Sequence, residues 1–359
     1  MTDTRLGPPE FQRPSPPDLG SSFATLLAGG SLSSAETQAA FEVMVSGNAH
    51  ESEIGAFLAL LAMRIPTSDE LLGAARVMRA HVDPVPTTLD RSRLIDTAGT
   101  GGAPKMFNVS TIAAIIAAGA GAKVAKHGNR SRTGRGSAEV LAQLGVNVDA
   151  DRDTQARCLE EAGICFCFAI HHHPATRHVI GARKALGFAT IFNLLGPLTN
   201  PAGAGRQVMG VYRKEFVRPI AEALLALGSI RAMVLHSEDG LDECSISAPT
   251  HVAHVQDGAV HEERIDPAAL GFKPAPLSAL QARDLEDAAA IFRNILSGEE
   301  SGPRENIAIL NAAATLMVAD LADSIADGVA RARSAIADGA AARALQQLID
   351  VSNGDGASA

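Results

Sequence analysis

The sixteen residues DTAGTGGAPKMFNVST, Asp96 to Thr111, predict a strand–loop–helix unit. They follow the strand-like run RLI and hold three glycines, then Asn108 and Ser110. Glycine lets a backbone turn sharply and bring its N–H groups close to a ligand. A helix that begins near Ser110 would present further N–H groups to an anion. A tight turn with a capping Ser or Thr has the same composition, so this stretch alone leaves both interpretations open.

The chain beyond this unit alternates strand-like and helical runs. Strand-like runs such as KVAKHG (123–128), ICFCFAI (164–170) and RAMVLHS (231–237) stand between alanine-rich or amphipathic helical runs. Such alternation is typical of parallel βαβ units. Residues 306–349 have a helical pattern nearly throughout. We therefore expect an α/β domain with a mostly parallel central sheet flanked by helices.

A smaller helical domain is predicted before it. SSAE (Ser33–Glu36) is a capping box that precedes an apolar-periodic run, and TSDE (Thr67–Glu70) opens a further helix with apolar residues on one face. The segment DPVPTT (83–88) breaks the pattern and is interpreted as a linker, so the helical domain is expected to span residues 21–88. Residues 1–20 contain five prolines and predict a flexible or polyproline-like tail.

Composition excludes several classes of function. Hydrophobic residues make up 46% of the 359 residues, and the net charge of −9 disfavours general attraction to nucleic acid or to an anionic membrane. No apolar run is long enough to span a bilayer, and the first residues lack the apolar core of a signal peptide. The four cysteines have no metal-site spacing and are expected to be reduced thiols, which favours a cytoplasmic location.

A second strand–loop–helix unit, VAKHGNRSRTGRGSAEVL (124–141), is rich in cations. Its polar residues include Lys126, His127, Asn129, Arg130, Arg132 and Arg135. Clustered cations before a helix could form a cradle for a polyphosphate. A solvated basic loop would have the same composition.

Two further segments carry polar side chains that could bind a metal or a substrate. The segment 171–202 begins with three histidines, but consecutive residues cannot all face one ion, and no carboxylate stands nearby in the sequence. DGLDE (239–243) follows a strand-like run and ends in Asp242 and Glu243. Adjacent carboxylates on a loop suit Mg²⁺, with water and phosphate oxygens completing its ligands. An acidic pair on its own is more often surface.

Together these segments resemble anthranilate phosphoribosyltransferases. The resemblance runs from about Ser21 to Ile349, and its most specific pieces are KHGNR (126–130), FNLLGPLTNP (192–201) and DGLDE. It implies a fold similar to class II pyrimidine nucleoside phosphorylases. Helices around 178–200 would join the helical domain in space, leaving 92–177 and 201–350 as the α/β domain. It also implies that phosphoribosyl pyrophosphate and Mg²⁺, expected as two ions, bind between the domains, and that the helical domain forms a homodimer.

The resemblance assigns roles to individual residues. The pyrophosphate loop and helix start are matched by Gly99, Thr100, Gly101, Gly102, Asn108, Ser110 and Thr111. The phosphoribosyl group is matched by Lys126 and Ser137. The metal ligands are matched by Ser110, Asp242 and Glu243. The lining of the acceptor tunnel is matched by His127, Asn129, His173, Arg183 and Pro197. Arg183 could pair with an acceptor carboxylate in a fork.

Two departures from the family pattern affect the acceptor. The family usually has an Asp after GTGG in a longer loop, whereas this chain has Ala103, Pro104 and Lys105, and its basic loop is about one residue shorter. The expected reaction joins the amine of anthranilate to the ribose and releases pyrophosphate. Alternatives are another aromatic acceptor, a nucleoside phosphorylase, and a nucleic-acid-binding relative without enzymatic activity. No general base is assigned, because an arylamine is neutral at pH 7.

The helical domain also suggests self-association. The apolar faces around Phe57, Leu61 and Leu71 exceed what three helices could bury alone. We therefore expect a homodimer through this region.

Overall fold

A computed structural model describes residues 19–102, 104, 106–131 and 134–354. The described strands are β1 Leu94–Asp96, β2 Lys123–Gly128, β3 Ile164–Phe168, β4 Arg206–Gly210, β5 Arg231–Ser237, β6 Thr250–Gln256 and β7 Ala259–Ile265. The predicted tail lies almost entirely outside the described residues, as do Ala103, Lys105 and Arg132. No helix in the described ranges is long and apolar enough to cross a membrane.

The described strands form one sheet in the order β3-β2-β1-β4-β5-β6-β7. Strands β1 to β5 pair in parallel, and β6 and β7 pair antiparallel at one edge. The chain moves outward from β1 to β3 and then returns to the other side of β1 with β4. The carboxyl ends of β1 and β4 therefore flank a topological switch point, where open α/β sheets bind ligands.

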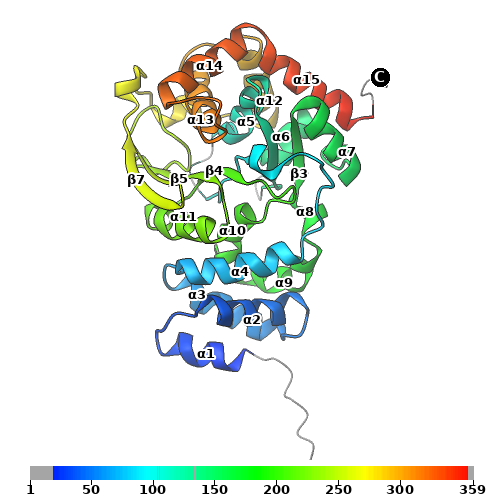
Figure 1. Cartoon of the computed structure of the whole chain (residues 1–359), viewed down its shortest axis with the longest axis vertical. Helices are drawn as coiled ribbons and strands as arrows, with labels where there is room; N and C mark the ends of the chain where they lie inside the picture. The colour runs from blue at the N-terminus through cyan, green and yellow to red at the C-terminus, as the bar shows by residue number, and fades with distance from the viewer. Residues whose placement is uncertain (1–18, 103, 105, 132–133, 355–359) are drawn as a thin grey trace, which may run out of the picture.

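Helices cover both faces of the sheet and form one end of the molecule (Figure 1). The first four helices are α1 Gly20–Leu27, α2 Ser34–Val45, α3 Glu51–Ala62 and α4 Ser68–Ala80. The middle of the chain holds α5 Val109–Gly119, α6 Ser137–Gln143, α7 Arg152–Arg157, α8 Ala169–His172, α9 Ile180–Leu186, α10 Ile191–Leu195 and α11 Val217–Ala226. The last four are α12 Leu285–Leu296, α13 Pro303–Val318, α14 Ile325–Ala337 and α15 Ala340–Ser352. This arrangement confirms the predicted fold class.

The predicted helix starts are present. Ser33 and Thr67 cap α2 and α4, and each accepts a hydrogen bond from the N–H of the Glu three residues on. Each of those glutamates in turn accepts from the N–H of its capping residue. Glu70 also accepts from the N–H of Leu32 at 2.9 Å, so the same carboxylate ties the loop before α2 to the start of α4.

The helical end of the molecule shares a buried cluster with later parts of the chain. Phe41 of α2 packs against Phe192 of α10, with ring centroids 5.5 Å apart, and the same cluster includes α11 and one face of β4, β5 and β6. Phe57, Leu61 and Leu71 are at most 1% exposed within the single chain. Our reason for expecting a dimer was therefore wrong, because α9, α10 and α11 add cover that three helices lack.

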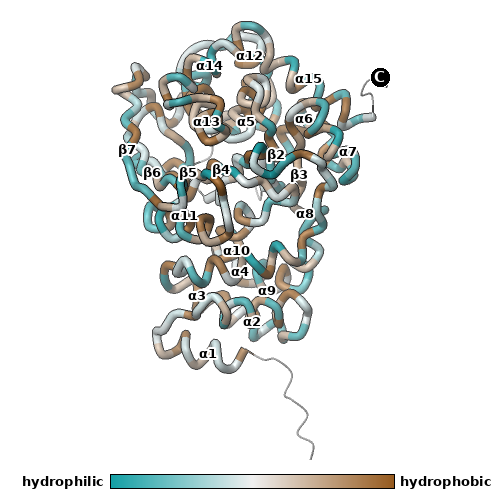
Figure 2. Tube along the Cα trace, viewed as in Figure 1, coloured by the Kyte–Doolittle hydropathy of each residue, from teal (hydrophilic) through white to brown (hydrophobic). Residues whose placement is uncertain are grey.

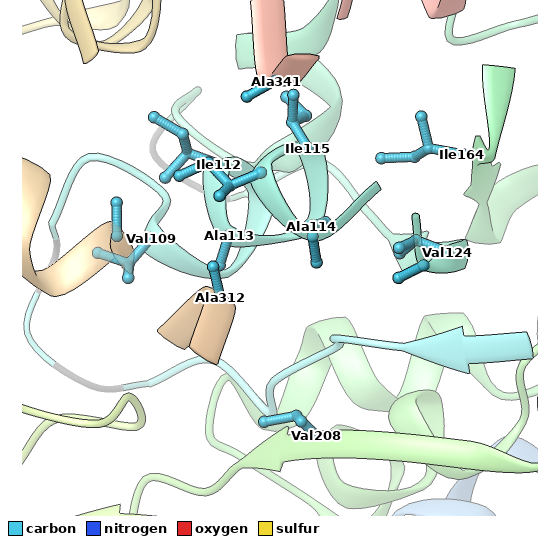
Figure 3. Close-up of a cluster of buried hydrophobic side chains, with 14 of the residues drawn as sticks. Val109, Ile112, Ala113, Ala114, Ile115, Val124, Ile164, Val208, Ala312 and Ala341 are labelled. Atoms are coloured by element: carbon cyan, nitrogen blue, oxygen red, sulfur yellow. The ribbon is translucent and has the colours of Figure 1, made fainter. Parts of the chain in front are cut away.

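The second buried cluster surrounds α5. Figure 3 shows Ala113 of α5 facing Ala312 of α13, and Ile115 close to Ala341 of α15. Small residues at these contacts let helix backbones approach closely, and Gly119 leaves no room for a Cβ beside Ala341. The close packing fixes the position of α5, whose first residues face the carboxyl ends of β1 and β4.

The antiparallel edge was not predicted. Strand β7 is hydrophilic along most of its length and largely exposed (Figure 2). It pairs with β6 across the turn at Asp257 and Gly258, which both have positive φ. The mostly parallel description of the sheet holds for β1 to β5.

Candidate active site

The glycine loop joins the end of β1 to the start of α5, as predicted. Asn108 precedes α5 with a left-handed φ of 67° and does not cap it with its side chain. Its Nδ2 instead donates to the carbonyl of Arg135, 3.2 Å away, in the basic loop. The alternative of a turn with a capping Ser or Thr is therefore excluded, because the residue before α5 is Asn108 and its side chain does not cap the helix.

The acidic pair lies opposite the start of α5. Glu243 Oε1 accepts a hydrogen bond from the N–H of Ser110 at 3.1 Å. Burial and then the neighbouring Asp242 raise the pKa of Glu243 to about 8, and burial raises the pKa of Asp242. Two adjacent carboxylates that are costly to ionise together form a site that a cation would stabilise. The pair therefore fits a divalent cation.

A cavity connects these elements at the switch point. Its lining comes from the glycine loop after β1, from α5, β4, β5 and α13, and from the acidic loop, which is the segment between β5 and β6 that carries the acidic pair. The lining residues are Thr97, Gly99, Ser110, Ala113, Val208, Gly210, Leu235, Asp242, Glu243, Asn311 and Thr315. Among the described residues, no group of three or more His, Cys, Asp or Glu side chains could hold a metal. A cation bound by the acidic pair would need further ligands from water or a substrate.

Lys126 supplies a buried cation beside the cavity. Its Nζ donates to the carbonyl and hydroxyl of Thr97, both at 3.2 Å, and to Ser110 Oγ at 3.4 Å. Burial lowers the pKa of Lys126, and the charges of Asp96 and Glu243 oppose that shift. The ammonium is thus held at the junction of β1 and α5.

Asp96 lies buried at the end of β1 and was not assigned a role from the sequence. Its Oδ1 accepts from the N–H of His127 at 3.0 Å, while Oδ2 has no hydrogen-bond partner within the described part of the chain. Burial raises its pKa to about 6. Asp96 therefore ties the ends of β1 and β2 together at an electrostatic cost.

The predicted acceptor histidines are brought together. The Nε2 atoms of His127 and His173 are 3.1 Å apart, and both rings are buried. Burial lowers the pKa of His173 to about 4 and lowers that of His127 well below its usual range. Both rings are therefore neutral at pH 7, so one donates to the other.

The three consecutive histidines have separate partners. His171 Nε2 lies 2.8 Å from Asp149 Oδ1, His172 Nδ1 lies 2.7 Å from the carbonyl oxygen of Asp83, and His173 faces His127. Each of the three rings therefore has a partner of its own. Folding brings the carboxylate of Asp149, which is distant in the sequence, beside His171.

The other residues predicted to line the acceptor tunnel lie on the basic loop, on α9 and in the short helical turn after α10. The guanidinium of Arg183 lies 5.0 Å from the ring centroid of Phe192, and Pro197 is buried with its carbonyl accepting from Gln207 at 2.6 Å. Asn129 is exposed, and its carbonyl accepts from Ser137 Oγ at 3.4 Å. Asn129 and Ser137 thus lie together at the two ends of the basic loop.

Two cations of the basic loop contact protein groups. Arg135 Nη1 donates to the carbonyls of Ala282 and Arg283, and the guanidinium of Arg130 lies 5.5 Å from the ring centroid of Phe168. Their involvement weakens the interpretation of the whole loop as a polyphosphate cradle. Lys126, by contrast, lies close enough to Glu243 of the acidic pair for the two charges to interact.

The comparisons with family models cover both parts of the chain. Residues 91–342 match the model described as the a/b domain of a glycosyl transferase family, and residues 22–82 match its helical bundle domain. Their order agrees with the two regions of the fold.

Two curated relatives that match most of the chain have the same name. The chain is 47% identical over 320 residues to the anthranilate phosphoribosyltransferase of Thioalkalivibrio sulfidiphilus (strain HL-EbGR7), covering 89% of this chain and 94% of that protein. It is 48% identical over 329 residues to that of Anaeromyxobacter dehalogenans (strain 2CP-C), covering 91% and 96%.

Solved structures agree with these relatives. The crystal structure of anthranilate phosphoribosyltransferase from Thermus thermophilus matches with a TM-score of 0.86 and 38% identity, covering 92% of this chain and 99% of that chain. The Saccharomyces cerevisiae enzyme in complex with PRPP and Mg matches with a TM-score of 0.84 and 28% identity, covering 94% and 98%. The chain therefore belongs to the anthranilate phosphoribosyltransferase family of glycosyl transferases.

Proposed function

We propose that this chain transfers the phosphoribosyl group of phosphoribosyl pyrophosphate to the amine of anthranilate, releases pyrophosphate and depends on Mg²⁺. The observation that carries the proposal is the meeting of the α5 N-terminus, buried Lys126 and the acidic pair around one cavity. That combination offers donors and a cation to a polyphosphate beside carboxylates for a metal.

The pyrophosphate would bind along the glycine loop and the start of α5. Gly101 and Gly102 have positive φ, and Thr100 is anchored by a hydrogen bond from its N–H to the carbonyl of Gly210 at 2.9 Å. The remaining residues proposed for this role are Gly99, Asn108, Ser110 and Thr111. Lys126 and Ser137 are proposed to contact the phosphoribosyl group. Fixed donors and a buried cation would stabilise the charge that develops on the leaving pyrophosphate.

The metal would be held by Asp242, Glu243 and Ser110, and we propose two ions. Bound Mg²⁺ would neutralise the pyrophosphate oxygens and make pyrophosphate a better leaving group. The raised pKa values of the pair support this role, since they express the cost of leaving both carboxylates ionised without a cation.

The acceptor would lie between the α/β sheet and α9–α10. Its carboxylate would pair with Arg183, and its ring would rest against the surfaces of His127, His173, Asn129 and Pro197. The two neutral imidazoles add polar contacts without competing with Arg183 for the carboxylate. An arylamine keeps its lone pair at pH 7, so catalysis would come mainly from positioning and electrostatics.

The test is a pyrophosphate-release assay with both substrates, with and without Mg²⁺. We expect release only when both substrates and the metal are present. The variant carrying Asp242→Asn and Glu243→Gln should lose most of this activity and keep its circular dichroism spectrum. Normal turnover of that variant at limiting Mg²⁺ would overturn the assignment of the pair.

A different aromatic acceptor is the second candidate. It is favoured by the Ala103-Pro104-Lys105 sequence and the short basic loop, both in segments assigned to substrate binding. Competition among anthranilate and substituted benzoates in the same assay separates the two. A benzoate turned over faster than anthranilate would favour this alternative.

A further inference from the structure

The buried side chain of Asn311 contacts the backbone next to the acidic pair. Asn311 belongs to α13 and lies 67 residues along the chain from Cys244, the residue after Glu243. Its Oδ1 accepts from the N–H of Cys244 at 2.9 Å, and its Nδ2 donates to the carbonyl of Cys244 at 3.0 Å. Nδ2 also donates to the carbonyl of Ile307 at 2.9 Å. Since the two backbone partners are a donor and an acceptor, they fix the orientation of the amide.

Several other contacts of the acidic loop come from its own neighbourhood. Ser237 Oγ donates to the carbonyl of Glu243 at 2.7 Å and lies 2.5 Å from Thr250 Oγ1. Ser245 Oγ donates to Asp239 Oδ2 at 2.6 Å. These bonds give the loop its internal shape, but all of them lie within the segment from β5 to the start of β6. The hydrogen bond from the N–H of Ser110 in α5 reaches the side chain of Glu243 rather than the backbone of the loop.

Helix α13 holds the loop by its backbone, through the two bonds between Asn311 and Cys244. It packs along α5, and Figure 3 shows Ala312, the residue after Asn311, facing Ala113 of α5. The start of the same helix α5 carries Ser110, whose N–H donates to Glu243. Asn311 therefore connects the acidic loop through a close-packed helix pair to the helix that faces it.

We infer that Asn311 is the positioning residue that holds Asp242 and Glu243 at the distance from α5 that a divalent cation requires. Two carboxylates held side by side in a buried site have an electrostatic cost when no cation is bound, and movement of the loop away from α5 would relieve that cost. Pairing both backbone groups of Cys244 resists that movement, so the site is formed before the cation arrives. This inference rests on the proposed metal role of the pair.

The experiment compares Asn311→Leu with the parent protein, because leucine has a similar volume and no hydrogen-bonding group. Mn²⁺ binding is measured by electron paramagnetic resonance, since Mn²⁺ also prefers carboxylate and water ligands. We expect the Mn²⁺ dissociation constant to rise roughly 10- to 100-fold, the usual effect of removing a group that orients a ligand. The acceptor KM at saturating metal should stay within about twofold, which general misfolding would not allow.

Ser352→Ala is the matched control. Ser352 is also buried, and its hydroxyl accepts from the N–H of Asn147 at 3.0 Å, far along the chain. The variant loses a hydrogen bond from a side chain to the backbone of a separate segment. The lost bond does not involve the acidic loop. Its Mn²⁺ dissociation constant should equal that of the parent protein.

Hydrogen exchange of the unsubstituted protein gives a second readout that needs no variant to fold. The amide of Cys244 should be protected in the metal-free protein, because Asn311 accepts its hydrogen. Protection that develops only after Mn²⁺ is added would overturn the inference. An Asn311→Leu protein that folds and binds Mn²⁺ as the parent does would also overturn it. If the parent protein binds no Mn²⁺, the proposed metal role fails instead.

Discussion

At the scale of single residues, Asp96 is a buried carboxylate for which ionisation is unfavourable. Its pKa is raised from 3.8 to about 6 by burial, a net value that already includes the attraction of Lys126. The folded protein therefore binds this proton more tightly than the unfolded chain. Its contribution to stability is greatest below pH ~4 and is lost as the pH rises through about 6.

Asp96→Asn is accordingly expected to stabilise the fold at neutral and alkaline pH. The gain should be roughly 2–3 kcal/mol at pH 8 and should vanish below pH ~4, where both states of the parent carry the proton. Urea unfolding at pH 4 and pH 8 measures it. A variant less stable than the parent at pH 8 would mean that the ionised carboxylate makes a favourable contact.

Arg183 tests the acceptor end of the site. Arg183→Ala should remove a charge-assisted hydrogen bond to the acceptor carboxylate, worth roughly 1.5–3 kcal/mol. The acceptor KM should then rise roughly tenfold to a hundredfold, while the phosphoribosyl pyrophosphate KM changes little. Lys184→Ala, at an exposed position on the same helix, is the control. Steady-state kinetics in which both constants rise together would assign Arg183 to the phosphate site or to the fold.

At the scale of elements, the end of β4 touches the acidic loop without space between them. A Cβ at Gly210 would lie 1.7 Å from the carbonyl oxygen of Asp242, so Gly210→Ala must displace the loop or the strand. A shift of about 1 Å at a catalytic group costs roughly 100-fold in rate, and we expect a loss of that size in kcat/KM.

The control for this prediction is Gly55→Ala in α3. No atom lies within 4 Å of the added Cβ, and replacing a helical glycine by alanine should stabilise the protein by roughly 0.5–1 kcal/mol. Thermal unfolding and initial rates of both variants provide the comparison. Full activity of Gly210→Ala would mean that the close approach has no role in holding the acidic pair.

Elements with local signals were the ones that the sequence predicted well. The capping boxes at Ser33 and Thr67 and the unit from β1 to α5 are set by neighbouring residues. The hairpin β6–β7 was not predicted, because β7 is exposed and lacks an alternating apolar pattern. The contact of Asn311 with Cys244 and the pairing of His171 with Asp149 were not predicted for a different reason. Each depends on a partner that only the tertiary fold brings near. The roles assigned to the site residues stay predictions.

At the scale of the whole molecule, the expected homodimer needs a surface other than the one first named. Leu27 at the end of α1 and Met63 after α3 are 73% and 83% exposed. Contact of this region with a second copy would cover both. We predict a dimer at micromolar concentration and a shift toward monomer for Met63→Asp, because a charge in an apolar interface is costly.

Sedimentation equilibrium measures the association constant of the parent protein and of Met63→Asp. Ile230→Asp is the control, because Ile230 is an exposed apolar residue of the α/β region, just before β5 and outside α1 to α4. It should leave the association constant unchanged. A parent protein that sediments only as a monomer would contradict the prediction.

The packing of Phe41 against Phe192 also has a consequence for synthesis on the ribosome. Domains generally fold as units, the N-terminal one first, while the chain is still being made. Here α1 to α4 are translated early, but the helix that carries Phe192 emerges only after β1, β2 and β3. Part of the apolar surface of α1 to α4 therefore stays exposed to solvent until α10 has been synthesised. The order in which these helices complete their packing thus differs from the order of translation.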